Sequence, residues 1–182
     1  MTRKTRQYII GYLIGGSLFL IGIPLGLYRV SRLFDHLTGI QLIPISGLRL
    51  TIAVILLLFG LLFAFWSGVV QNTIGMGGPL EVMNIEVSPK TQNLVVTGPY
   101  RYTRNPMLFG GCVYYYAVAI YLNSVIAIAI VTLFMTFMLV FVIPTEERRL
   151  LKDFGSDYEE YRQRVSKFVP WTQKQPRSLR DR

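Results

Sequence analysis

Four long apolar runs dominate the chain and decide what it can fold into. They extend over residues 8–28, 48–70, 107–122 and 125–143. At about 1.5 Å per residue, helices over the second and fourth runs reach roughly 35 Å and 28 Å, close to the roughly 30 Å of a bilayer core. The third reaches only about 24 Å, so it tilts little or starts inside a protein-lined region. We predict an all-α, multi-pass integral membrane protein with about four transmembrane helices.

The composition agrees with a membrane location. Apolar residues make up 52% of the 182 residues and charged residues only 16%, a balance that is hard to reconcile with a soluble domain. The net charge of +9 favours contact with anionic lipid headgroups here, and we expect no nucleic-acid partner. The single cysteine, Cys112, and the single histidine, His36, exclude an internal disulfide and a cysteine or histidine metal cluster.

The ends of the chain give its predicted orientation and extent. Arg3, Lys4 and Arg6 precede the first run and a basic tail follows the last, so both termini are expected on the cytoplasmic side. We expect one membrane domain over 1–170 and a disordered polar tail over 171–182. The first run also carries regularly spaced glycines on one face, which predicts close helix packing there. These glycines are Gly11, Gly15, Gly22 and Gly26.

Two polar clusters flank the third and fourth runs, which only Asn123 and Ser124 separate. Such a short connection predicts a tight antiparallel hairpin, with both clusters at the same membrane face. The first cluster, "GPYRYTRNP", contains Tyr100, Arg104 and Asn105 and ends at Pro106. Proline presets the first turn of a helix, and the backbone N–H groups that follow form an anion site. Arg101 and Tyr102 fit ordinary membrane-interface behaviour about as well.

The second cluster begins at Glu146 and Glu147, after the fourth run. We expect Pro144 to end that run and Thr145 to cap a new helix. At 100° per residue, Glu147 falls near the centre of the apolar face of this helix, where an unpaired carboxylate would be costly. Gly155 then predicts a stop and a restart, giving a pair of short cytosolic helices at the C-terminal end. Tyr158 and Tyr161 lie on the inner face of the second helix.

Together the clusters offer groups for an anion, groups for an ammonium and aromatic surface. A ligand with a carboxylate, an ammonium, a sulfonium and an adenine ring would use all of them, and S-adenosylmethionine is such a ligand. Residue spacing alone does not identify it.

Two longer segments carry a resemblance to a known family. "LVVTGPYRYTRNPMLFGG" followed by "PTEERRLLKDFGSDYEEYRQRVSKFVP" resembles the isoprenylcysteine carboxyl methyltransferase family and its phospholipid methyltransferase relatives. The resemblance covers residues 94–170 and contains both family signatures in order. It implies a small multi-helix membrane enzyme that binds S-adenosylmethionine in a cytosol-facing pocket and takes a lipophilic acceptor from the bilayer.

The resemblance also implies site residues. Arg104 and Asn105 stand at the arginine and histidine of the family's R-H-P element, and Glu146 and Glu147 match paired glutamates that would hold the cofactor's ammonium. Lys167, a predicted substrate-binding residue, stands where many members have arginine. Asn105 cannot act as a general base as histidine could, and Lys167 lacks the planar fork of arginine. The predicted cofactor-binding set is Tyr100, Arg104, Asn105, Pro106, Met107, Leu108, Glu146, Glu147, Tyr158 and Tyr161.

The predicted reaction is methyl transfer from S-adenosylmethionine to a prenylcysteine-like carboxylate or a phospholipid amine, with Arg104 and Glu147 as catalytic residues. A carboxylate acceptor needs orientation only, whereas an amine must lose a proton, for which Glu147 is the candidate base. Two alternatives stay open: an NADPH-dependent membrane reductase of a sterol-like lipid, and a non-catalytic membrane protein that binds lipid or a partner. The sequence leaves the acceptor and the oligomeric state open.

Overall fold

The computed structural model describes residues 15–75, 81–82, 85–86 and 92–171, and within them the chain is mainly helical. Arg3, Lys4, Arg6, Gly11 and most of the predicted tail lie outside these residues. The elements in chain order are η1 (Leu18–Gly22), α2 (Ile23–Thr38), α3 (Ser46–Thr73), β1 (Glu81–Val82), β2 (Ile85–Glu86), η2 (Gly98–Arg101), α4 (Pro106–Leu122), α5 (Val125–Phe137), η3 (Met138–Val142) and α6 (Ile143–Arg164). The two strands form one two-residue antiparallel pair. The predicted all-α class is confirmed.

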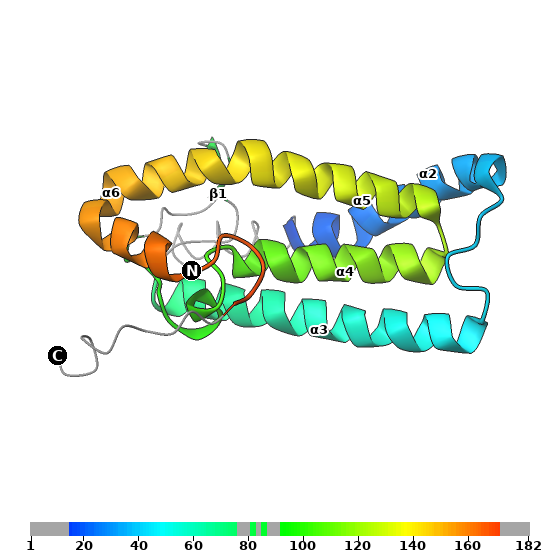
Figure 1. Ribbon diagram of the computed structural model, residues 1–182, viewed down its shortest axis with the longest axis horizontal. Coiled ribbons are helices and arrows are strands. Elements are labelled where there is room, and N and C mark those ends of the chain that lie inside the picture. The colour runs from blue at the N-terminus through cyan, green and yellow to red at the C-terminus, as the bar shows by residue number, and fades with distance from the viewer. Residues whose placement is uncertain (1–14, 76–80, 83–84, 87–91, 172–182) are drawn as a thin grey trace, which may run out of the picture.

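Three helical stretches of the described residues are long and apolar enough to cross a membrane: Gly15–Thr38, Ser46–Thr73 and Val125–Arg164. The fourth predicted crossing, α4, is apolar but has only 17 residues. It lies between α3 on one side and the α5–α6 helix on the other (Figure 1). Ala117 and Ala119 of α4 are completely buried, so protein rather than lipid surrounds much of this helix. A helix in that position need not match the full bilayer thickness.

The closest helix contact is between α3 and α4. A Cβ added to Gly60 would lie 2.6 Å from the backbone nitrogen of Tyr114, and one added to Gly110 would lie 2.6 Å from that of Ala64. Only glycine allows two backbones to approach so closely. The predicted packing through glycines of the first helix is wrong for Gly22 and Gly26. A Cβ on Gly22 would meet only atoms of its own helix, and one on Gly26 would meet nothing within 4 Å.

The short connection between α4 and α5 is the predicted tight hairpin. Asn123 adopts the left-handed conformation, with φ 57°, and Ser124 caps α5 by accepting a 2.9 Å hydrogen bond from the Ala127 amide. The Ser124 hydroxyl also donates to the Asp35 carboxylate at the end of α2, at 2.8 Å. The hairpin therefore fixes three helices at one end of the bundle and sends α4 and α5 back together toward the other end.

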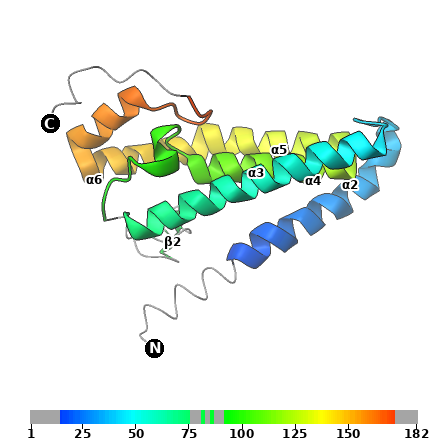
Figure 2. The same ribbon diagram turned by 90° about the horizontal axis from the view of Figure 1, so that it is seen from below.

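The helix that begins with α5 does not stop at Pro144, contrary to the sequence-based expectation. It continues through the π-helical turn η3 into α6, and the Thr145 hydroxyl donates back to the Phe141 carbonyl at 2.9 Å instead of capping a new helix. The apolar residues 125–143 form the part that can span a membrane, and the polar residues from Thr145 onward lie beyond it. Gly155, with non-helical φ 53° and ψ −125°, interrupts α6 and joins two helical segments across a bend, which confirms the predicted stop and restart at this residue. The bend turns the end of α6 back toward the start of α4 (Figures 1 and 2).

Candidate functional site

The candidate site centres on an ion pair between the two predicted polar clusters. Arg104 lies just before α4 and Glu147 lies in the first turns of α6, and Nη1 of the arginine is 2.9 Å from Oε1 of the glutamate. Their side chains are only 10% and 15% exposed. The hairpin at Asn123 brings them together, since it returns α5 and α6 alongside α4. The carboxylate that sequence analysis placed on an apolar face thus has a cationic partner.

The pair retains unused hydrogen-bonding capacity. Although the two atoms are close, neither Arg104 Nη1 nor Glu147 Oε1 has a well-aligned hydrogen bond, and Arg104 Nε is buried without a partner. Buried polar atoms are normally hydrogen-bonded, and exceptions often mark a place for a ligand, ion or water. Arg104 can therefore donate to an anion, and Glu147 can accept from a cation.

The start of α4 adds a second anion-binding feature beside Arg104. Asn105 precedes the helix, but no side chain caps its first turn, whereas Ser124 caps α5. Pro106 is the first residue of α4 and is fully buried. The positive end of the helix and the amides after Pro106 thus favour a negative group at this point.

All three predicted tyrosines, Tyr100, Tyr158 and Tyr161, lie near the two clusters. Tyr158 is 1% exposed and Tyr161 is 7% exposed, and the Tyr161 hydroxyl donates to the Tyr100 carbonyl at 2.8 Å. Burial, followed by the charge of Glu147, raises the pKa of Tyr158 to about 12, while the Arg104 guanidinium acts in the opposite direction. Burial and the Glu146 carboxylate raise the pKa of Tyr100. These hydroxyls stay protonated near neutral pH.

Glu146 is the second carboxylate at the site. Burial raises its pKa from 4.5 to about 7. A carboxylate desolvated in this way is close to half-protonated at neutral pH, so a cation nearby would favour its charged form. Glu146 and Glu147 together therefore offer a partner for an ammonium.

Residues 165–171, which we call the C-terminal strap, follow α6 and pass beside residues 102–105. The Arg104 amide donates to the Ser166 carbonyl at 2.9 Å, and the Trp171 amide donates to the Tyr102 carbonyl at 3.0 Å. The Asn105 side-chain amide donates to the Lys167 carbonyl at 2.8 Å. The Lys167 ammonium donates to the Leu139 carbonyl at 3.1 Å.

Sequence reasoning named one strap residue, Lys167, as substrate-binding, but missed the backbone contacts between the strap and residues 102–105. It also missed Thr103, which is fully buried. The Thr103 hydroxyl accepts a hydrogen bond from the Asn105 backbone amide at 3.2 Å and donates one to the Lys167 carbonyl at 3.4 Å. The family-like segment "RVSKFVP" was the available signal, but it did not show which surface the strap covers. Of the other predicted residues, Met107 points toward Gly68 of α3, and Leu108 packs on the hydrophobic core. Their side chains therefore pack within the bundle.

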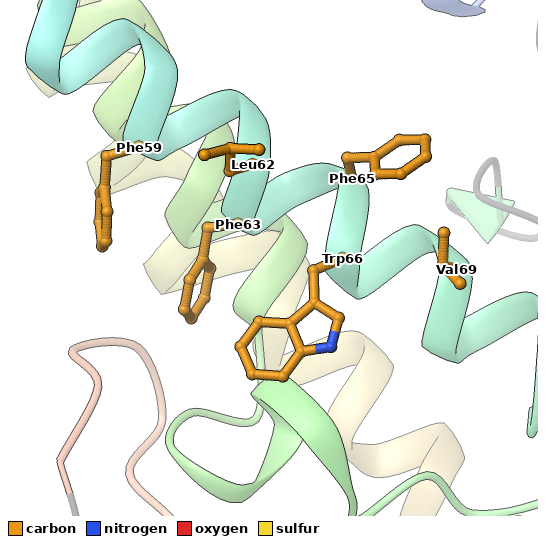
Figure 3. Close-up of a pocket in the computed structure, with 6 residues that line it drawn as sticks. All are labelled: Phe59, Leu62, Phe63, Phe65, Trp66 and Val69. Carbon is orange, nitrogen blue, oxygen red and sulfur yellow. The ribbon is translucent and has the colours of Figure 1, made fainter.

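An apolar groove of about 560 Å³ lies on the outer face of α3. Figure 3 shows its six lining side chains, Phe59, Leu62, Phe63, Phe65, Trp66 and Val69. Phe63 stacks edge-on against Phe109 of α4, and Phe109 stacks against Phe168 of the strap, with ring centroids 5.3 Å and 5.7 Å apart. The groove contains none of the predicted site residues, but these rings connect its wall to the strap and to the first turn of α4.

Comparison with known proteins places the chain in a family. The family model described as phospholipid methyltransferase matches residues 48–157, which is more than half of the chain. The chain belongs to the phospholipid methyltransferase family. The match runs from α3 to the bend of α6 and includes both Arg104 and Glu147, whereas the strap lies outside it. The predicted family resemblance is confirmed.

The chain matches two individual proteins over part of their length. Methanethiol S-methyltransferase 1 of Bradyrhizobium diazoefficiens is 35% identical over 72 residues, which are 40% of this chain and 24% of that protein. The solved structure of the eukaryotic intramembrane Ras methyltransferase ICMT (isoprenylcysteine carboxyl methyltransferase) aligns with 94% of this chain and 55% of its own, at 21% identity and a TM-score of 0.45. The chain thus spans about a quarter of the first relative and about half of the second.

Proposed function

We propose that the protein is a membrane methyltransferase that transfers a methyl group from S-adenosylmethionine to a lipophilic acceptor. The observation that carries the proposal is the buried Arg104–Glu147 pair, whose polar atoms keep unused hydrogen-bonding capacity beside an uncapped helix start. Membership in the phospholipid methyltransferase family supports the reaction class.

The residues present fit the cofactor. We infer that its carboxylate binds Arg104 Nε and the first amides of α4, since both are donors without an intramolecular cap. Its ammonium then binds Glu147 and Glu146, the two carboxylates at the start of α6. Tyr100, which is half-buried, supplies aromatic surface for the rest of the molecule, whereas the Tyr158 and Tyr161 rings are buried.

When bound, S-adenosylmethionine supplies an electrophilic methyl group on a sulfonium. The protein's task is then to orient the acceptor and to exclude water, because the positive charge on sulfur disperses during the displacement. For a carboxylate acceptor, Arg104 orients the attacking oxygen, and no base is needed. For an amine acceptor, a proton must leave, and Glu147 is the candidate base.

The acceptor class follows from where the groove lies. An apolar, aromatic-lined surface on the membrane-facing side of α3 suits a hydrocarbon chain in the bilayer. The ring contacts through Phe63, Phe109 and Phe168 lead from it toward the strap beside Arg104. We therefore infer a phospholipid amine or a prenylcysteine-like carboxylate rather than a small soluble acceptor, with catalysis at the cytoplasmic membrane face.

Equilibrium binding of S-adenosylmethionine to the detergent-solubilised protein tests the proposal. We expect saturable binding that S-adenosylhomocysteine competes away. Arg104→Ala should weaken binding at least tenfold, the effect of losing a charge-assisted hydrogen bond worth about 1.5–3 kcal/mol. Arg101→Ala is the matched control, since Arg101 lies three residues earlier and is exposed.

Two results would count against the proposal. Absence of saturable binding by the folded wild-type protein would remove the cofactor and leave the reductase and non-catalytic alternatives. Equal weakening by Arg101→Ala and Arg104→Ala would show that general positive charge, not the buried pair, attracts the ligand.

A further inference from the structure

The Leu139 carbonyl has lost its usual helical donors. In the π-helical turn η3, the Ile143 amide donates to the Met138 carbonyl, so it is directed away from Leu139. The next residue, Pro144, has no N–H to donate. Leu139 belongs to the apolar residues 125–143, where an unsatisfied carbonyl costs several kcal/mol. A donor from another part of the chain is therefore needed.

Lys167 supplies that donor. Its ammonium lies 3.1 Å from the Leu139 carbonyl oxygen, and its side chain is half-buried. Other parts of the fold solve the same problem with neutral donors. At the first π-helical turn, η1, the Tyr115 and Tyr114 hydroxyls donate to the carbonyls of Phe19 and Leu20 at 3.0 Å and 3.1 Å. At η3 the donor is charged and comes from the strap, which ties the strap to the membrane helix.

The backbone of the same residue is held from the opposite side. The Lys167 carbonyl accepts a 2.8 Å hydrogen bond from the Asn105 side-chain amide, and the neighbouring Ser166 carbonyl accepts a 2.9 Å bond from the Arg104 amide. A continuous chain of contacts therefore runs from Asn105 at the start of α4, through Lys167, to Leu139 in η3. Arg104 lies directly beside this chain, with its guanidinium directed at Glu147.

We propose that Lys167 and Asn105 are positioning residues that clamp the strap between η3 and the start of α4 and thereby hold Arg104 in its binding position. The identity of the ligand, S-adenosylmethionine, rests on the proposed function, whereas the contacts of the clamp do not. In this proposal the Lys167 ammonium binds the Leu139 backbone carbonyl, and the Asn105 side-chain amide binds the strap through the Lys167 carbonyl. It also explains why asparagine can stand at a position that often carries histidine, since either side chain can donate one N–H to the Lys167 carbonyl.

Two measurements test the clamp. The first is hydrogen exchange at the Arg104 and Trp171 amides, which both donate across the strap contact. The second is the dissociation constant for S-adenosylmethionine. We expect Lys167→Met to speed exchange at both amides and to weaken binding about tenfold, because a hydrogen bond from a charged donor is lost. Lys167→Arg should restore both, since the guanidinium keeps the donor and the charge.

The controls separate a clamp from a general effect of charge or folding. Lys152→Met removes an exposed lysine from α6 and should change neither measurement. Asn105→Leu should resemble Lys167→Met, and Asn105→His should resemble the wild type. The effects of Asn105→Leu and Lys167→Met on exchange and on binding should be less than additive in the double variant, because both changes open the same contact.

The outcomes are distinguishable from those for the proposed function. Wild-type exchange rates in Lys167→Met would overturn the clamp, whatever the protein binds. Faster exchange with unchanged affinity for S-adenosylmethionine would overturn the link between the strap and Arg104. If the wild-type protein does not bind S-adenosylmethionine, the proposed function fails, while the exchange rates still decide whether Lys167 fastens the strap.

Discussion

Two ion pairs, one between Arg104 and α6 and the other within α6, differ in burial, and this difference sets what each contributes to stability. Arg104 and Glu147 are 10% and 15% exposed, whereas Arg162 and Glu159, 3.3 Å apart, are 42% and 38% exposed. Solvent screens an exposed pair, so its contribution is about 0–1 kcal/mol. Removing one partner of a buried pair leaves an uncompensated charge in a poorly solvated place.

We therefore expect Arg104→Ala to lower the free energy of unfolding by about 3 kcal/mol, against less than about 1 kcal/mol for Arg162→Ala. Chemical unfolding in detergent micelles, followed by circular dichroism, measures both. Replacing the pair together, as Arg104→Met with Glu147→Leu, should be less destabilising than Arg104→Ala alone. Similar losses from the two arginine variants would mean that the Arg104–Glu147 pair is as well solvated as the exposed one.

Glu146 gives the site a pH dependence whose sign can be worked out. Its pKa is raised by burial to about 7, so the carboxyl group loses its proton and becomes charged as the pH rises through neutrality. The neighbouring Tyr100 has a raised pKa and stays neutral in this range. Since only the charged carboxylate attracts an ammonium, S-adenosylmethionine should bind more tightly at pH 7.5 than at pH 5.5. Above about pH 8 the ligand's own amino group begins to lose its proton, so the test belongs below that value.

Isothermal titration of S-adenosylmethionine across this range measures the effect. Glu146→Gln should weaken binding at pH 7.5 and flatten the dependence, because the titrating group is gone. A pH profile that is the same in Glu146→Gln would assign the titration to another group.

The sequence predicted some of these residue contacts and not others for a physical reason. Arg104 and Glu147 could be paired because helix periodicity and a two-residue hairpin fix their positions. Asn105 and Lys167 are separated by 62 residues, and their contact depends on the path of the strap. Gly155 could be predicted to interrupt the helix, but the direction of the bend and the need of the Leu139 carbonyl for a donor could not be read from the residue pattern.

At the scale of elements, the α3–α4 crossing is the tightest contact in the bundle. The Gly60 and Gly110 backbones meet so closely that a Cβ on either would lie 2.6 Å from backbone nitrogen of the other helix. Backbone cannot move aside as a flexible side chain can. The sequence placed such packing at the wrong glycines, because glycine spacing alone does not show which helix faces which.

We expect Gly60→Ala to destabilise the protein by about 1–3 kcal/mol, the usual cost of overpacking. Gly26→Ala is the control: nothing lies within 4 Å of its added Cβ, so stability should hold or rise slightly with helix propensity. Thermal unfolding of the two variants in the same detergent makes the comparison. Equal stability of both variants would place the α3–α4 crossing farther apart than the structure has it.

The α5–α6 helix shows why proline was misleading as a stop signal. In a soluble helix, proline removes one hydrogen bond and often ends the helix. Here η3 accommodates Pro144, and the ammonium of Lys167 satisfies the carbonyl that lost its donor. Inside a membrane, continuing the helix avoids exposing further backbone groups to lipid. A local proline rule cannot anticipate a donor that comes from the strap.

At the scale of the whole molecule, the bundle has two unlike ends. One holds the Asn123 hairpin and the Asp35–Ser124 contact, and the other holds Arg104, Glu147 and the strap. Since α4 joins them and its 17 residues rise about 25 Å, we expect the two ends to lie at opposite faces of a membrane. A charged cofactor made in the cytoplasm could reach only one of them. The proposed function therefore requires the Arg104 end to face the cytoplasm.

Accessibility of introduced cysteines tests this orientation. His36→Cys marks the hairpin end and Ser156→Cys marks the site end, and both positions are exposed. We expect a membrane-impermeant maleimide added to intact cells to label His36→Cys, and to label Ser156→Cys only after permeabilisation. The wild type is its own control, because its single cysteine, Cys112, is 7% exposed and should stay unlabelled in both conditions. Labelling of both variants from outside would contradict a spanning bundle, and the reverse pattern would place Arg104 and Glu147 away from the cytoplasmic supply of S-adenosylmethionine.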